Sequence, residues 1–372
     1  MTDEPTWIPV AEPLLAGNEL KYVTDCVQSG WISSLGKYVR DFEQQFAAYC
    51  GVRYGVATFN GTVALHLLML TLNIGPGDEV IVPSLTYVAT ANAVRYTGAT
   101  PVFVDSDPYT WNIDPQRVAE AVTPRTRAIV AVHLYGHPAD MDPLRAIADT
   151  HGLFLLEDAA EAHGACYKGR RVGGLGDAAI FSFYGNKIIT TGEGGILVTD
   201  NQAWAERAFF LENQGRYADN PYWHPEVGYN YRMTNIQAAI GLAQLEQIDT
   251  MIARRRENAA HYNRRLAGVP GLTLPPNADW AENVYWMYSV VIGDEFGLPR
   301  DEVRARLRAA GIDTRPFFYP IHTLPMYQTG QSLPVAEDLG RRGINLPSAA
   351  TLTPDQIDYI CDTLLTLAGG KS

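Results

Sequence analysis

Short apolar runs alternate along the first two thirds of the chain with segments in which apolar residues recur at helical spacing. The apolar runs end at glycine, proline or polar residues, which is the pattern of buried strands. They predict strands at residues 52–57, up to 83, 101–105, 128–132, 153–158, 178–183 and 196–199. The helical segments predict helices at residues 17–30, 38–50, 86–97, 142–150 and 202–213, and another directly after Thr62. This alternation predicts an α/β fold in which helices cover both faces of a mostly parallel sheet.

The last third of the chain predicts a second, smaller domain. A chain of 372 residues is longer than the size at which one hydrophobic core usually stops growing. The elements predicted there are a long connecting helix at 235–266, a β-like run at 284–292 and helices at 299–310 and 353–368. We therefore expect a large α/β domain over residues 1–250, N-terminal helices included, and a small α+β domain over residues 251–372.

Composition and charge narrow the function classes. Hydrophobic residues at 47% and charged residues at 19% are typical of a globular protein. The net charge of -12 argues against a nucleic-acid-binding surface. We see no secretory signal at the start and no apolar run long enough to cross a bilayer. The four cysteines are scattered and form no CxxC pair, so we expect a cytoplasmic protein without a metal site.

The stretch from Asp177 to Asp200 carries the first candidate chemistry. It contains an apolar strand, a Gly-Asn-Lys turn that ends in Lys187, a polar glycine-rich loop and a second apolar strand. A lysine held against apolar walls loses solvation of its ammonium form, so its pKa falls and its neutral amine can condense with an aldehyde or ketone. The alternative is an ordinary solvated loop lysine.

Two further sites lie next to predicted helices. Asn60, Gly61 and Thr62 come directly before an apolar helix, where free N–H groups and the helix dipole favour an anion such as a phosphate. The alternative there is an ordinary helix cap. Tyr87 lies near the carboxyl edge of the preceding strand, where ligands bind in open α/β sheets, and it could stack on a flat ring. Its alternative is simple packing.

A carboxylate follows the apolar strand at 153–158. Asp158 at its end is a candidate for chemistry, with a helix cap or a metal ligand as alternatives. The metal interpretation lacks a second acidic cluster, because Glu157 would point to the opposite face of the strand. Glu161 and His163 follow in a loop of small residues.

Other segments could line a pocket or could be purely structural. The first is the loop that contains Trp31, Ser33 and Ser34, and another is the proline-rich segment with Arg315 and His322. A long polar and aromatic loop runs from about residue 213 to 235. Loops of this length are usually functional or involved in contacts between chains.

Three of these features together resemble one known family. Asn-Gly-Thr at 60–62, the acidic segment at 158–164 and FSFYGNKIITTGEGG at 181–195 are similar to the DegT/DnrJ/EryC1/StrS family of sugar aminotransferases. These enzymes depend on pyridoxal 5′-phosphate (PLP) and have the fold of type I aminotransferases. The resemblance extends over essentially the whole chain, and its most specific part is the segment at 181–195.

The resemblance implies roles for the residues around Lys187. Lys187 would hold PLP through a Schiff base and would move the proton during transfer of the amino group. Asp158 would pair with the pyridinium nitrogen and keep it protonated. Glu161, where many relatives have Gln, would lie beside the ring hydroxyl, and Tyr87 would stack on the ring. His163 has the position of a family residue near the sugar.

The resemblance also implies how the phosphate is held. Ser182 would bind it together with the N–H groups of Gly61 and Thr62, next to Asn60. Asn235 matches a residue that relatives supply to the same phosphate across a dimer interface. The resemblance therefore implies a homodimer whose active site is shared between the two chains.

Within the family, the chain resembles most the members that act on GDP-4-keto-6-deoxymannose. The implied reaction moves an amino group from L-glutamate to PLP, giving pyridoxamine phosphate (PMP), and then to C4 of the sugar to form GDP-perosamine, a sugar of lipopolysaccharide O-antigens. The alternatives are a UDP- or dTDP-linked keto sugar, or a non-catalytic sugar-nucleotide-binding or regulatory protein. Relatives that dehydrate the sugar at C3 have His in place of the lysine, so Lys187 argues for transamination. Candidate substrate contacts are Trp31, Ser33, Ser34, Arg315, Phe317 and Tyr319, each of which could equally be structural.

Overall fold

A seven-stranded sheet forms the centre of the larger part of the molecule. The computed structural model describes residues 7–217, 219–220, 222–328 and 330–369. In the sheet the strands are ordered β1-β9-β8-β5-β4-β2-β3. Strand β9 pairs antiparallel with both of its neighbours, and the other neighbouring strands run parallel. The strands are β1 (Tyr54–Thr58), β2 (Glu79–Pro83), β3 (Thr100–Val104), β4 (Thr126–Val132), β5 (Phe154–Asp158), β8 (Ala178–Ser182) and β9 (Gly195–Thr199). The predicted mostly parallel sheet is confirmed.

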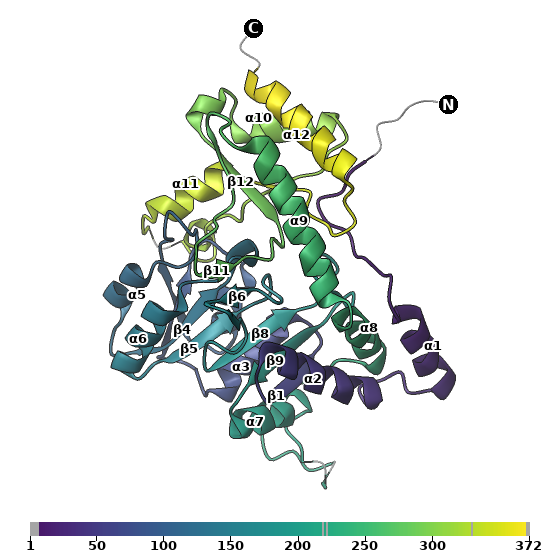
Figure 1. Cartoon of the computed structure of the whole chain (residues 1–372). Helices are drawn as coiled ribbons and strands as arrows, with labels where there is room; N and C mark the ends of the chain where they lie inside the picture. The colour runs from purple at the N-terminus through teal and green to yellow at the C-terminus, as the bar shows by residue number, and fades with distance from the viewer. Residues whose placement is uncertain (1–6, 218, 221, 329, 370–372) are drawn as a thin grey trace.

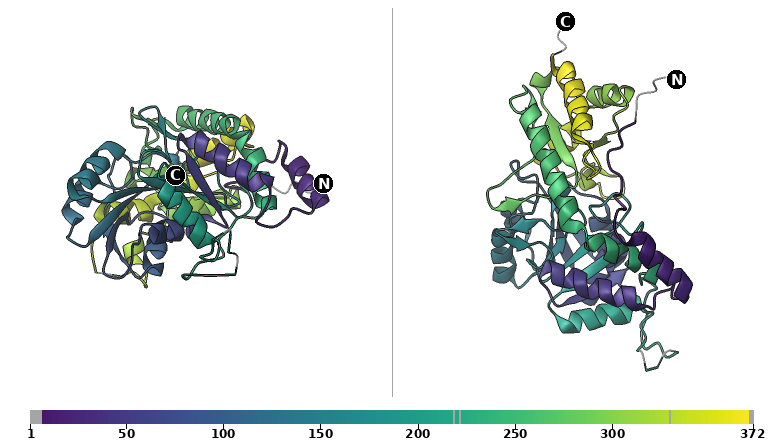
Figure 2. Two further views of the ribbon diagram at one scale, coloured as in Figure 1. Left: turned by 90° about the horizontal axis from the view of Figure 1, so that it is seen from below. Right: turned by 45° about the vertical axis from the view of Figure 1, so that its right-hand side comes forward.

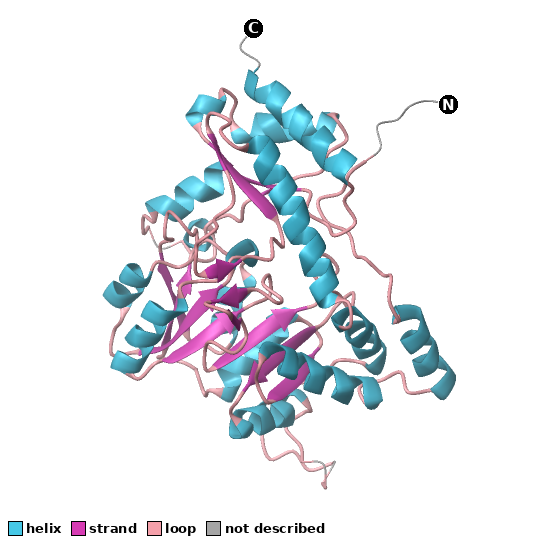
Figure 3. Ribbon diagram, viewed as in Figure 1, coloured by secondary structure: helices cyan, strands magenta, loops and turns pink. Residues whose placement is uncertain are grey.

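Helices cover both faces of this sheet (Figure 3). On one face α3 packs against β8, β9 and β1 and also touches α4 and α7. On the other face α2 packs on β1 and β9, while α6 packs on β4 and β5. Because α3 is enclosed by the sheet and two helices, most of its residues are buried, and most of these are apolar. These helices are α2 (Lys37–Cys50), α3 (Gly61–Thr71), α4 (Ala89–Tyr96), α5 (Pro115–Ala121), α6 (Met141–His151) and α7 (Gln202–Glu212).

The prediction of one continuous helix at residues 235–266 is wrong, although the segment is helical. The structure has two helices there, α8 (Asn235–Leu245) and α9 (Ile248–Leu266). The helical hydrogen bonding is interrupted between them, where the N–H of Gln247 donates to the carbonyl of Gln244. Helix α8 packs against α2 and α1 (Glu19–Ser29), whereas α9 leaves the core of the large sheet after Ile252 and packs against α12 (Pro354–Gly369). Figure 1 shows α9 rising from the large sheet into the upper part of the molecule.

A second hydrophobic cluster lies in that upper part (Figure 2). It is built on a four-stranded antiparallel sheet ordered β10-β12-β14-β13. Its strands and helices are β10 (Leu272–Thr273), β12 (Tyr288–Ile292), β13 (Arg315–Pro316), β14 (Gly343–Leu346), α10 (Arg300–Ala309) and α11 (Pro334–Arg342). The helices predicted at 299–310 and 353–368 correspond to α10 and α12 within one residue at each end.

The strand predicted at residues 284–292 begins later than expected. Strand β12 starts at Tyr288, and the preceding residues leave the strand conformation because Tyr285 has a φ of 48°. The chain here passes very close to Gly136, where a Cβ would lie 2.8 Å from the backbone nitrogen of Trp286. Val284, Trp286 and Met287 therefore pack in the large sheet's core instead of extending the strand, while Tyr285 packs against the core of the smaller part.

Each hydrophobic cluster contains residues from the part of the chain that mainly forms the other cluster. Ile8 belongs to the second cluster because its backbone pairs with Ile312. Conversely, Phe317 and Ile321 belong to the first cluster. The boundary at residue 250 stays a prediction. Residues 1–6, where the sequence predicts no secretory signal, lie outside the described residues. Within the described part of the chain, no helix combines the length and the apolar character that crossing a membrane requires.

A matched pair of methionines tests the position of the core. Met69 on α3 is fully buried, whereas Met326 is 65% exposed. We expect Met69→Ala to lower the free energy of unfolding by about 2–5 kcal/mol, because it removes buried apolar atoms and leaves a cavity. Met326→Ala should change it by less than about 0.5 kcal/mol. Urea unfolding measures both values, and equal losses for the two variants would contradict this placement of α3.

Candidate active site

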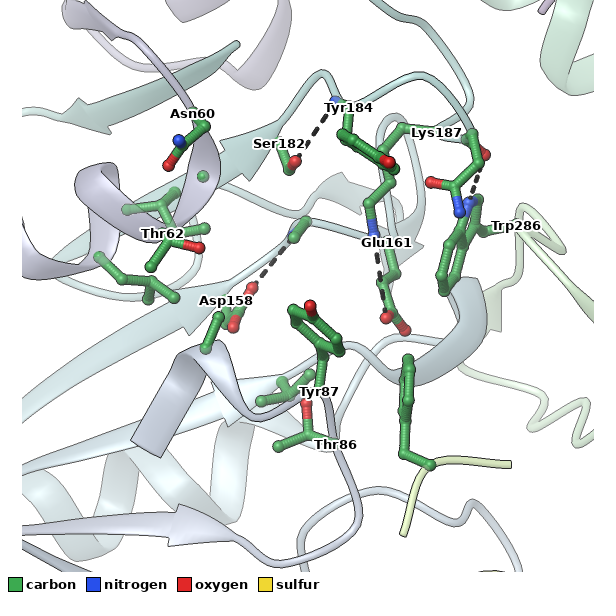
Figure 4. A pocket seen from close by; sticks show the side chains of 18 of the residues that line it. Asn60, Thr62, Thr86, Tyr87, Asp158, Glu161, Ser182, Tyr184, Lys187 and Trp286 are labelled. Carbon is green, nitrogen blue, oxygen red and sulfur yellow. Dashed lines mark hydrogen bonds and ion pairs between the residues drawn. The ribbon is translucent and has the colours of Figure 1, made fainter. Parts of the chain in front are cut away.

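A cavity of about 400 Å³ opens at the carboxyl ends of the parallel strands (Figure 4). Its walls come from the ends of β4, β5 and β8, from the first turn of α3 and from the loop before α4. Trp286 and Phe318 close one side of it. Eight residues predicted from the sequence line this cavity together: Asn60, Gly61, Thr62, Tyr87, Asp158, Glu161, Ser182 and Lys187.

One end of the cavity is suited to an anion. The side chain of Asn60 caps α3 by accepting the N–H of Val63 at 3.0 Å, so Gly61 and Thr62 provide the first N–H groups of the helix. Ser182 lies opposite at the end of β8. A Cβ on Gly61 would lie 2.8 Å from the Cβ of Ser182, so the close approach of the two segments requires glycine. N–H groups and a hydroxyl that converge at a helix N-terminus form a typical phosphate site.

A carboxylate lies deeper in the cavity. Asp158 is the last residue of β5, and its Oδ2 accepts the hydroxyl of Thr90 at 2.7 Å. The N–H of Ala160 donates to its Oδ1 at 3.2 Å. Burial raises the pKa of Asp158, and a cationic N–H partner would favour its ionised form. This environment is suited to a protonated ring nitrogen. Thr90 was not anticipated from the sequence, although it lies in the first turn of α4, next to the cavity.

Lys187 faces Glu161 across the cavity. The Lys187 Nζ lies 3.9 Å from Glu161 Oε1, and both side chains are nearly buried. Burial lowers the pKa of Lys187 and raises the pKa of Glu161 to about 7. The other carboxylate oxygen of Glu161 accepts the N–H of Tyr135 at 2.8 Å. The pair thus combines an amine that loses its proton readily with an adjacent proton acceptor.

The cavity has three aromatic residues that were not predicted from the sequence: Tyr184, Trp286 and Phe318. The ring centroid of Trp286 lies 3.8 Å from Lys187 Nζ, and its indole N–H donates to the carbonyl of Asn186 at 2.8 Å. Phe318 packs on Tyr87, with ring centroids 5.7 Å apart. Trp286 lies in the segment expected to be a strand, and Phe318 adjoins the wrongly chosen Phe317. The only available signal was a cluster of aromatic residues in each segment.

His163 does not line the cavity, which corrects its predicted place near the sugar. Its ring is fully buried and packs against Phe46, Phe181 and Phe183. Burial lowers the pKa of His163 to about 3, so the ring is neutral. The surrounding aromatic rings, rather than a ligand, occupy its immediate environment.

The predicted contacts in the proline-rich segment also require correction. Phe317 is buried in the core against Trp111 and Tyr135, and Tyr319 is 64% exposed. Arg315 forms an ion pair with Asp313 at 3.3 Å. In an extended segment successive side chains point to opposite sides, so Phe318 reaches the cavity while its two neighbours do not.

The N-terminal candidates lie outside the cavity of this chain as well. Trp31, Ser33 and Ser34 occupy the loop between α1 and α2, and Trp31 is 57% exposed. None of the three is among the described residues that line the cavity. The loop is tied to α8, because the N–H of Asn235 donates to the carbonyl of Ser33 at 2.6 Å.

Asn235 is also placed differently from the expectation. Its side chain is buried in its own chain, where Oδ1 accepts the N–H of Tyr38 at 3.1 Å. Its amide nitrogen donates to the carbonyl of Trp31 at 2.7 Å and to Cys26 Sγ at 3.2 Å. With both amide hydrogens used, the side chain has no donor left for a phosphate, so the predicted phosphate role does not fit.

Comparison with known proteins assigns the chain to a class. The model of the DegT/DnrJ/EryC1/StrS aminotransferase family matches residues 13–365, and the chain belongs to this family. The crystal structure of DesI in the presence of its TDP-sugar product is similar with a TM-score of 0.91 at 38% identity, covering 99% of this chain and 94% of DesI. The fold is therefore that of the type I PLP-dependent sugar aminotransferases, as predicted.

Two relatives that are more similar in sequence to this chain than DesI is have a name that specifies the product of the enzyme. GDP-perosamine synthase of Caulobacter vibrioides is 50% identical over 367 residues, which cover 98% of this chain and 99% of the relative. GDP-perosamine synthase of Escherichia coli O157:H7 is 49% identical over 359 residues, covering 96% and 98%.

The family and the fold imply PLP, and the residues present fit it. The anion site at Gly61 and Ser182 suits its phosphate, and the buried Asp158 suits its ring nitrogen. Lys187 supplies the amine that such a cofactor requires. The role of each residue nevertheless stays a prediction.

The anion site can be tested with a single methyl group. Gly61→Ala would push the α3 N-terminus away from Ser182. We expect the Kd for PLP to rise about tenfold or more, a loss of about 1.4 kcal/mol, in a fluorescence titration. Gly75→Ala is the control, because the nearest atom to its Cβ would be 3.8 Å away. An equal loss of affinity for pyridoxal, which lacks the phosphate, would argue against a phosphate site here.

Proposed function

We propose that this protein transfers an amino group from L-glutamate to C4 of GDP-4-keto-6-deoxy-D-mannose and so forms GDP-perosamine. The GDP-perosamine synthases that match it over nearly their full length support this substrate. The observation that carries the proposal is the buried amine of Lys187 beside Glu161, in one cavity with Asp158 and an anion site. A cytoplasmic location stays a prediction.

We assign a separate role in the reaction to each of three charged side chains of the cavity, Lys187, Glu161 and Asp158. PLP, when bound, supplies a carbonyl, an electron-accepting ring and, as PMP, a carrier for the amino group. Lys187 binds the cofactor and moves a proton to and from the carbon that bears the amino group. Glu161, whose pKa is raised to about 7 by burial, accepts or returns a proton near neutral pH. Asp158 keeps the ring nitrogen protonated.

The remaining residues orient and enclose the reactants. Gly61, Thr62 and Ser182 would bind the phosphate, and Tyr87, in the loop before α4, would stack on the ring; all four line the cavity. Phe318 packs on Tyr87, with the ring centroids 5.7 Å apart, and forms part of the same wall of the cavity.

The second candidate function is the same reaction on a TDP-linked or UDP-linked sugar. The similarity to DesI, whose structure contains a TDP-sugar product, is the observation that favours it. Lower identity than to the GDP-perosamine synthases makes it the weaker candidate. A purely binding or regulatory role is weaker still, because such a role does not need a buried lysine next to a proton acceptor.

We propose further that the active form is a homodimer. Among the described residues that line the cavity, three are acidic (Asp158, Glu161 and Glu193) and Lys187 is the one cation. Glutamate and a nucleotide sugar are both anionic, so this lining repels parts of the substrates. Cationic groups from a second copy of the chain would complete the site.

An exposed apolar surface supports the same proposal. Helix α1 and its flanking loops expose six large apolar side chains: Leu15, Leu20, Val27, Trp31, Ile32 and Leu35. Isolated exposed apolar residues are common, but a cluster of this kind marks an interaction surface. Because the cavity needs a second copy of this chain, we assign that surface to the dimer.

The substrate is tested with a panel of 4-keto-6-deoxy nucleotide sugars. The protein is incubated with PLP, glutamate and the GDP-, UDP- or dTDP-linked sugar, and 2-oxoglutarate release is measured. We expect multiple turnovers with the GDP-linked mannose derivative and parallel initial-rate lines. Lys187→Ala should reduce turnover by at least about 100-fold. Turnover with a UDP- or dTDP-linked sugar alone would exclude the GDP assignment and leave the reaction class intact.

The dimer is tested by sedimentation. We expect a species of twice the 41.0 kDa chain mass, and the Leu20→Asp and Val27→Asp double variant should dissociate and lose activity together. Tyr109→Asp is the control, since Tyr109 is also highly exposed but lies outside the apolar surface. A fully active monomer would show that the dimer proposal is wrong.

A further inference from the structure

Trp286 contacts both the reactive lysine and the residue before it. The face of its indole lies 3.8 Å from Lys187 Nζ, measured to the ring centroid. Its indole N–H donates to the carbonyl of Asn186, the residue directly before Lys187, at 2.8 Å. Figure 4 shows the indole beside the end of the lysine side chain. One side chain thus contacts both the amine and the turn that carries it.

The indole is held in place independently of the lysine. The carbonyl of Trp286 accepts an N–H of Arg255 at 3.1 Å and the hydroxyl of Ser348 at 3.0 Å. Its ring lies nearly parallel to that of Tyr135, with the centroids 6.3 Å apart. Gly136 allows the two backbones to approach closely. The ring position is therefore built into the fold.

The charged groups around Lys187 lie too far away to hold its ammonium by a hydrogen bond, so the indole ring can stabilise it. Asp158 and Glu161 are the carboxylates that act on the ammonium, while His163 behind them is neutral. Glu161 Oε1 at 3.9 Å is too far for a hydrogen bond. Among the described residues, no carboxylate lies within hydrogen-bond distance of this ammonium, and the face of an indole is the most favourable aromatic surface for a desolvated cation.

We propose that Trp286 is a positioning residue for Lys187. The ring face of Trp286 holds the ammonium form of Lys187 at the cavity wall, and the indole N–H of Trp286 fixes the turn before Lys187. The proposal rests on the proposed function for the catalytic role of Lys187. The contact itself is a property of the chain without substrate. It also links the segment before β12 to the turn that follows β8.

The test measures the protonation of Lys187 in the protein without cofactor. Competitive acetylation over a pH series, followed by peptide mass spectrometry, gives the apparent pKa of this one lysine. Loss of the cation–π contact disfavours the ammonium, so Trp286→Leu should lower that pKa by about one pH unit, or about tenfold in the protonation equilibrium. Trp204→Leu is the control, because Trp204 lies in α7, packs on Phe154 of β5 and is not among the described residues that line the cavity.

A second experiment changes the electron density of the Trp286 ring while its volume stays nearly the same. Fluorinated tryptophan in place of all seven tryptophans withdraws electron density from the ring face, and only the Lys187 peptide is read. We expect the pKa to fall in the same direction. An unchanged pKa in the fluorinated protein, or a raised one in Trp286→Leu, would overturn the proposal. Because no sugar is present, this outcome is independent of whether the substrate assignment holds.

Discussion

Removing the amine of Lys187 from water is the constraint on which the other features of the site depend. In solution this group would carry a proton at neutral pH and would not act as a nucleophile. In the cavity, burial lowers its pKa, while Glu161 at 3.9 Å opposes that shift. The balance allows the same nitrogen to lose and regain a proton, which transfer of an amino group requires.

The fold provides this environment by bringing distant segments to one edge of the sheet. Parallel strands β4 and β5 end side by side, so Asp158 and the loop with Glu161 meet there. The first turn of α3 approaches Ser182 closely enough to form an anion site. The side of the cavity at Trp286 and Phe318 is closed by chain segments that lie beyond residue 280 and pack against the hydrophobic cluster of the large sheet.

Residues that belong to compact motifs could be predicted from the sequence, and those fixed by packing could not. Asn60, Gly61 and Thr62 form a helix start, which has a recognisable local pattern. Trp286 was hidden because Tyr285 adopts a φ of 48° inside an apolar run that looks like a strand. The break between α8 and α9 also has no local signal, since it separates a helix that packs on α1 and α2 from one that leads on to α12.

The same distinction explains the corrections at single positions. The resemblance implies a place near the sugar for His163, but aromatic rings from α2 and β8 enclose it. The resemblance implies a phosphate contact across a dimer interface for Asn235, yet its amide holds the loop before α2. Polar side chains near a motif can equally serve the fold, and only the three-dimensional contacts separate the two uses.

The central claim is that Lys187 is the residue that binds the cofactor. The most direct measurement is reduction of the PLP-loaded protein with borohydride, followed by peptide mapping of the covalent adduct. We predict that the adduct lies on Lys187 alone and that Lys187→Ala yields none. An adduct on another lysine, or unchanged labelling of the variant, would contradict the account.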